Sequence, residues 1–119
     1  MKIKALILLI VSVTFISAKA QNIGMIYNKE SEKTAFSAQE IESILKEKGI
    51  QSIKYDLSQQ NQKRAEQITI VLVSLNEKNA SELIKKAGII NASELKDEGF
   101  LVHSTEVKRQ KTIYILGKD

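Results

Sequence analysis

The 119-residue sequence contains no cysteine, no proline and no tryptophan, and it has one histidine. Without cysteine, an exported chain can form no disulfide, so its hydrophobic core must stabilise the fold unaided. The lone His103, with no cysteine beside it, excludes the usual zinc constellations. The five glycines stand singly and form no phosphate-binding loop. We therefore expect no cofactor and no metal, and the sequence assigns no catalytic residue.

Aromatic residues make up only 5% of the chain. Sugar rings are usually held by aromatic stacking surfaces, so the composition gives poor support to an independent carbohydrate-binding module. No serine stands in a Gly-x-Ser-x-Gly elbow. The acidic residues fall mostly at expected helix starts, helix faces and turns, where a solvated charge is the ordinary role. An enzyme in its own right is thus the least favoured class.

Residues 1–20 have the layout of a secretory signal peptide. A basic start, the apolar run Ala5–Ile16 and small residues at the Ala-x-Ala positions precede Gln21. We expect cleavage between Ala20 and Gln21 and a mature chain of 99 residues in the periplasm or outside the cell. The apolar run is shorter than the about 20 residues that span a bilayer. A stable membrane anchor is therefore not expected.

The basic excess of the whole chain belongs largely to this expected signal peptide. Removing Lys2, Lys4 and Lys19 from the 18 basic residues leaves 15 against 14 acidic residues, a net charge of about +1. A nearly neutral domain offers no electrostatic footprint for nucleic acid. We therefore expect no nucleic-acid partner.

The mature chain is organised around Ile68–Ser74, where nearly every residue is apolar and β-branched or leucine. Such a continuous apolar run is typical of a strand buried on both faces. Further strands are expected at Ile23–Tyr27, Ile50–Asp56, Glu98–Ser104 and Lys111–Leu116, the last two forming an antiparallel hairpin through the polar connection Val107–Gln110.

One helix is expected to follow a polar loop at Asn28–Thr34. It begins at the capping box Ser37–Glu40 and ends at Gly49. Its apolar stripe contains Ala38, Ile41, Ile44 and Leu45.

The five-residue sequence Asn-Ala-Ser-Glu-Leu occurs at residues 79–83 and again at 91–95. Each copy places a capping residue ahead of a glutamate, which predicts a helix start. The first helix should stop at Gly88, and the second should be a single turn. The polar stretch Leu57–Gln67 is interpreted as a surface loop or a ragged helix. The fold class is therefore α/β (α+β), with a small mixed sheet of about five strands and two or three helices.

From Ile68 onward, the sequence resembles the small α/β domain that precedes the catalytic barrel in several exo-glycosidases. These are the beta-N-acetylhexosaminidases, alpha-glucuronidases and alpha-N-acetylglucosaminidases, and the domain is described as hexosaminidase domain-2-like. The similarity lies in the buried strand, the helix with Ala80, Leu83 and Ile84, the strand Glu98–Val102, and the final run Ile113–Asp119. In such enzymes an Ile-x-Ile-x-Gly-x-Asp run is typically followed by Arg-Gly and the first barrel helix.

The resemblance implies that residues 21–119 form an accessory domain of a secreted glycoside hydrolase of carbohydrate degradation. The chain is expected to end where the catalytic barrel would begin, with that barrel as its partner, in cis or missing. Catalytic acids of these enzymes lie on the barrel, so none is transferred to this sequence.

Both faces of the hairpin carry large apolar groups. In one interpretation, only one face packs against the domain's own helices and the other receives a partner. In an equally supported alternative, a second helix layer from Ser81 to Ala87 covers the other face. The expected partner-facing residues are Phe100, Val102, Tyr114 and Leu116. The alternative is a stand-alone exported α/β protein that binds a protein or peptide, for example through an open sheet edge.

Overall fold

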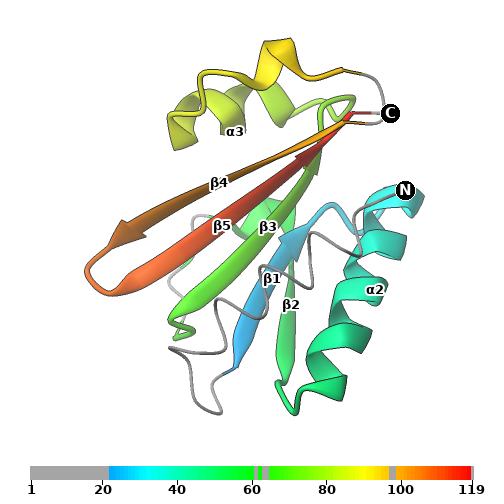
Figure 1. Cartoon of the computed structure of the whole chain (residues 1–119), viewed down its shortest axis with the longest axis vertical. Coiled ribbons are helices and arrows are strands. Elements are labelled where there is room, and N and C mark those ends of the chain that lie inside the picture. The colour runs from blue at the N-terminus through cyan, green and yellow to red at the C-terminus, as the bar shows by residue number, and fades with distance from the viewer. Residues whose placement is uncertain (1–21, 61, 63–64, 97–98, 119) are drawn as a thin grey trace.

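The computed structural model describes residues 22–60, 62, 65–96 and 99–118. The expected signal peptide and the Ala20–Gln21 cleavage position lie outside these residues. Five described strands form one sheet in the order β2-β1-β3-β5-β4, as Figure 1 shows. Strands β2, β1, β3 and β5 run parallel, and β4 is antiparallel to β5. The strands are β1 (Ile23–Tyr27), β2 (Ser52–Asp56), β3 (Ile68–Ser74), β4 (Phe100–Val107) and β5 (Gln110–Gly117). The predicted mixed sheet is confirmed.

Two helices cover opposite faces of this sheet, and we name the faces after them. Helix α2 (Glu32–Glu47) packs Ala38, Ile41 and Leu45 onto one face, the α2 face. Helix α3 (Ala80–Ala87) lies on the other, the α3 face, near the carboxyl ends of β3 and β5 (Figure 1). The described residues therefore form three layers, and each sheet face has its own apolar cluster. The expectation that only one face packs against the domain's own helices is wrong, and the second helix layer at Ser81–Ala87 is confirmed.

Strand β3 lies at the centre of the sheet, as its continuous apolar sequence predicts. Every side chain from Ile68 to Val73 is buried. Ile70 and Leu72 belong to the cluster on the α2 face, whereas Val71 and Val73 belong to the cluster on the α3 face. Because successive strand residues point to opposite faces, a strand with both faces covered must be apolar throughout.

The N-cap of helix α2 lies six residues before the predicted N-cap Ser37, so the predicted start and the last part of the predicted loop are wrong. The helix N-cap is Ser31, whose hydroxyl accepts a hydrogen bond from the Thr34 amide at 3.4 Å. Thr34 is buried, and its own hydroxyl donates to Glu77 at 2.8 Å. This contact with the segment after β3 favours the earlier start. The predicted end is correct, because Gly49 has a φ of 75°, a left-handed conformation that suits glycine.

The two copies of Asn-Ala-Ser-Glu-Leu behave as predicted in outline. The first opens α3, which ends at Gly88 with a φ of 76°. The second gives one turn of 3-10 helix, η2 (Ala92–Glu94). Asn79 and Asn91 occupy the N-cap positions of these two elements, as the sequence predicts, but neither makes a side-chain capping hydrogen bond. Another turn of 3-10 helix, η1 (Leu57–Gln59), forms the first part of the stretch that was interpreted as a surface loop or a ragged helix.

The β4–β5 hairpin is longer than the sequence predicts. Val107 and Gln110 pair with each other, which leaves a turn of two residues, Lys108 and Arg109. Both have positive φ values, 49° and 68°. Positive φ at both central positions is the geometry of a type I′ turn, which matches the twist of the flanking strands. Because Lys-Arg lacks the usual Asn-Gly signature, the sequence did not reveal this turn.

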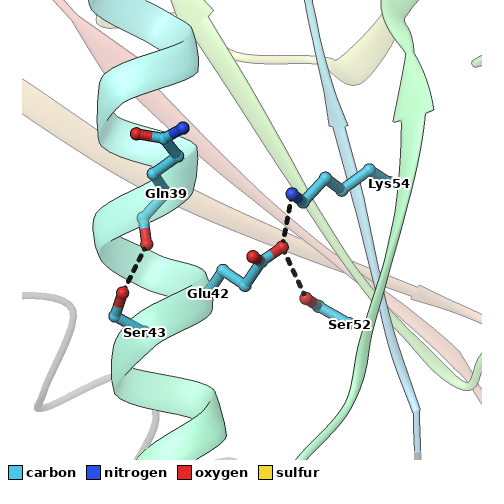
Figure 2. A network of polar contacts seen from close by, with 5 residues as sticks. All are labelled: Gln39, Glu42, Ser43, Ser52 and Lys54. Atoms are coloured by element: carbon cyan, nitrogen blue, oxygen red, sulfur yellow. Dashed lines mark hydrogen bonds and ion pairs between the residues drawn. The ribbon is translucent and has the colours of Figure 1, made fainter.

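A polar network fastens α2 to the edge strand β2, as Figure 2 shows. Lys54 Nζ lies 2.6 Å from Glu42 Oε2, and the Ser52 hydroxyl donates to the same oxygen at 3.5 Å. The hydrogen bond with Glu42 raises the pKa of Lys54, with a smaller opposing effect of desolvation. On the helix itself, the Ser43 hydroxyl donates to the Gln39 carbonyl oxygen at 3.0 Å. Both charged side chains are partly exposed, so this contact positions the helix more than it stabilises the fold.

Candidate functional site

The four residues expected to face a partner lie on two different faces of the sheet. Val102 pairs with Ile115, which belongs to the cluster on the α2 face. Phe100, two positions earlier on the same strand, shares that face. Tyr114 and Leu116 belong to the cluster on the α3 face. The four side chains therefore do not form one continuous surface.

Their burial differs as much as their direction. Leu116 is completely buried, so in this chain it belongs to the core and presents no surface. Tyr114 is half-buried and contacts the ring of His103, with ring centroids 6.2 Å apart. Phe100 is half-buried, and Val102 is 38% exposed. A partner-facing role for Phe100, Val102 and Tyr114 stays a prediction.

A cavity lies at the amino ends of the parallel strands, on the α3 face of the sheet. Its volume is about 250 Å³. Its described lining comes from the residue before β1, from β2 and from the approach to β3, namely Asn22, Ile53, Ala65, Glu66 and Gln67. We call this space the Glu66 cavity. Among the described lining residues, it contains one carboxylate, two side-chain amides and no aromatic ring.

Glu66 is the unusual residue of this cavity, because it is only 6% exposed. The Tyr55 hydroxyl donates a hydrogen bond to its Oε1. Gly24 lies beneath the pair. A Cβ placed there would lie 3.4 Å from the Tyr55 ring and 3.5 Å from Glu66 Oε1. A side chain larger than a methyl group at this position would therefore press on the Tyr55–Glu66 pair.

No sequence pattern identifies Glu66 as a candidate site residue. It falls in the polar stretch before β3 that was interpreted as a surface loop or a ragged helix, where an acidic side chain ordinarily points to water. Its burial depends on residues distant in sequence, Gly24 on β1 and Tyr55 on β2, and no local pattern encodes that arrangement.

Two other carboxylates lie at the opposite, carboxyl edge of the sheet. Asp56 caps η1, and Glu77 accepts a hydrogen bond from a residue of α2. Hydrogen bonds from the Ser58 hydroxyl, the Ser58 amide and the Lys29 amide lower the pKa of Asp56. Glu77 Oε1 accepts the hydroxyl hydrogen bond of Thr34, and its Oε2 is buried without a hydrogen-bond partner. These contacts fix η1 and the start of α2.

Two kinds of feature are absent from the described part of the chain. Residues 22–60, 62, 65–96 and 99–118 hold no group of three or more His, Cys, Asp or Glu side chains that is arranged for a metal ion. In the same residues, no helix has the length and apolar character needed to cross a membrane.

One protein-family model matches most of the sequence. The family model described as "Glycosyl hydrolase family 67 N-terminus" matches residues 13–119. The chain belongs to this family. The resemblance to an accessory N-terminal domain of glycoside hydrolases, of the alpha-glucuronidase kind, is confirmed at the level of the family. No curated protein and no solved structure matches this family 67 N-terminal domain.

Proposed function

We propose that this family 67 N-terminal domain is a non-catalytic accessory domain of an exported glycoside hydrolase that degrades carbohydrate. In this proposal, it packs against the catalytic barrel of the same protein. The observation that carries the proposal is the family match over residues 13–119, which includes every described strand and helix.

The arrangement of the carboxylates supports the non-catalytic part of this proposal. Glycoside hydrolysis ordinarily needs two carboxyl groups, about 5–9.5 Å apart, on either side of the scissile bond. The Glu66 cavity has a single carboxylate among its described lining residues. At the opposite edge of the sheet, Asp56 caps η1 and Glu77 accepts a hydrogen bond from the Thr34 hydroxyl. The catalytic acids would then belong to the barrel, as the resemblance implies.

The pattern of residues 1–20 supports export, since a basic start, a short apolar run and small residues before Gln21 are typical of a cleaved signal. In this proposal, the domain works in the periplasm or outside the cell. A fold without cysteine is compatible with either compartment.

Two assays test the proposed function. The full chain, incubated with 4-nitrophenyl glycosides, should release no 4-nitrophenol above the blank. When mixed with the catalytic domain of a family 67 glycoside hydrolase that lacks its own N-terminal domain, it should form a complex and raise the melting temperature of that domain.

A matched pair of variants locates the contact. Val102→Ser changes an expected partner-facing residue, whereas Val107→Ser changes the same residue type at the hairpin tip, where Val107 is 65% exposed. Only Val102→Ser should weaken the complex, provided that circular dichroism shows both variants folded. Release of 4-nitrophenol by the chain alone would contradict the proposal, as would the absence of any complex.

A further inference from the structure

We propose that the Glu66 cavity binds a positively charged guanidinium or ammonium group, and that this group is an arginine or lysine side chain of the catalytic domain. The identity of the partner rests on the proposed function. The preference for a cation rests on the cavity alone.

The Glu66 side chain is almost completely removed from water. A carboxylate removed from water is costly unless it is paired and hydrogen-bonded. Glu66 is 6% exposed, and the described hydrogen bond to it comes from a neutral donor, the Tyr55 hydroxyl. The lysine of β2, Lys54, lies on the α2 face and is paired with Glu42. In the described part of the chain, the carboxylate therefore has a neutral partner and adjoins an open space.

The Glu66 cavity has both polar and apolar lining residues. Asn22 and Gln67 line the cavity and are exposed, and the carbonyl oxygens of their side-chain amides can accept hydrogen bonds from a cationic donor. Ile53 is 39% exposed and supplies an apolar wall. Lysine and arginine combine an apolar stem with a charged head, so they fit a site that has both features.

A neutral sugar and a divalent metal ion fit the Glu66 cavity less well than an organic cation does. A neutral sugar would leave the charge of Glu66 uncompensated, and it would find no aromatic ring for stacking among the described lining residues. A divalent metal ion prefers several oxygen ligands with more than one carboxylate. Among the described residues, Glu66 is the only acidic member of the lining. An organic cation therefore fits best.

The test is a titration of the full chain, followed through its backbone amide signals by NMR. The probe is N-acetyl-arginine methylamide, and the neutral control is N-acetyl-citrulline methylamide, which has the same shape without the charge. We expect saturable shifts at Asn22, Ala65, Glu66 and Gln67 with the arginine probe, and at least tenfold weaker binding of the citrulline probe.

Variants tie the binding to the carboxylate. Glu66→Gln keeps an acceptor for the Tyr55 hydroxyl and removes the charge, so it should weaken arginine binding at least tenfold. Glu82→Gln, an exposed change on α3, is the matched control and should bind like the wild type. If Glu66→Gln does not fold, Asn22→Ala and Gln67→Ala, at exposed lining positions, should each weaken binding about two- to fivefold.

Equal binding of the citrulline probe, or unchanged binding by a folded Glu66→Gln chain, would overturn the inference. So would the absence of saturable shifts. This outcome is distinct from failure of the proposed function, because the probe is added without a catalytic domain. A chain that binds arginine but no catalytic domain would refute the accessory role alone, and the reverse result would refute the cation site alone.

Discussion

Replacing Val71 with alanine tests how the fold is built. Val71 lies in the middle of the central strand and is 3% exposed. It pairs with Ile26 on β1 and with Tyr114 on β5, and it belongs to the cluster on the α3 face. Because neighbours surround it on both sides, the backbone cannot collapse easily into the space that the substitution leaves.

The expected cost follows from the atoms that are removed. Val71→Ala deletes two methyl groups, and transfer of each from the core to water accounts for about 0.8 kcal/mol. The unfilled volume adds about 24 cal/mol per Å³ of residual cavity. Together these terms lower the free energy of unfolding by about 1.5–3 kcal/mol. For a domain of this size, each kcal/mol shifts the melting temperature by about 4–8 °C.

The assay is urea unfolding of the full chain, followed by circular dichroism, with a thermal melt as a second measurement. Val107→Ala is the matched control, because it makes the same change at a side chain that is 65% exposed. It should change the free energy of unfolding by no more than about 0.5 kcal/mol. If Val71→Ala and Val107→Ala have the same small effect, β3 is not the centre of the core and the reasoning is wrong.

Three further predictions concern the turn, the response to acid and export. Replacing Lys108-Arg109 by Asn-Gly should stabilise the chain by about 0.5–1.5 kcal/mol in urea unfolding, because these residues accept the positive φ values of a type I′ turn; a loss of stability would show that the turn has another geometry. The lowered pKa of Asp56 contributes stability above the ordinary carboxyl pKa, and this contribution is lost as the pH falls through the lower, folded-state pKa. The stability difference between wild type and Asp56→Asn should therefore be present at about pH 6, begin to fall near the ordinary carboxyl pKa of 3.8, and vanish only below the lower, folded-state pKa; a difference that stays constant as the pH falls from about 6 to about 2 would refute the assignment. Mass spectrometry of the exported protein from its native host should show a chain that begins at Gln21, whereas a retained Met1 in the soluble cytoplasmic fraction would contradict export.

Much of the fold could be predicted because its signals are local. The unbroken apolar run at Ile68–Ser74 identifies a strand covered on both faces, and Gly49 and Gly88 mark helix ends where the backbone needs a positive φ. The start of α2 was wrong for a physical reason. Serine is a common N-cap residue at either Ser31 or Ser37, and the earlier start is favoured by the part-buried hydrogen bond between Thr34 and Glu77, which sequence spacing cannot show.

The candidate site was less accessible to sequence reasoning than the fold. Period-two alternation correctly gave Phe100 and Val102 a common face, and Tyr114 and Leu116 a common face. It could not show how the faces of the two strands align, so all four residues were expected on one partner-facing side, whereas the structure places the two pairs on opposite faces. Leu116 is buried because it belongs to the cluster that α3 completes, a fact of topology. Glu66 was missed for a similar reason, since its burial results from three strands meeting and not from its own sequence neighbours.

The central claim is that this domain serves a glycoside hydrolase. It is tested most directly by mass spectrometry of the native polypeptide that carries this sequence, isolated from its host. The account predicts that peptides from residues 22–118 occur in one polypeptide with a glycoside hydrolase barrel, or in a stable stoichiometric complex with one. A mature protein that consists of this domain alone, bound to no glycoside hydrolase, would contradict the account.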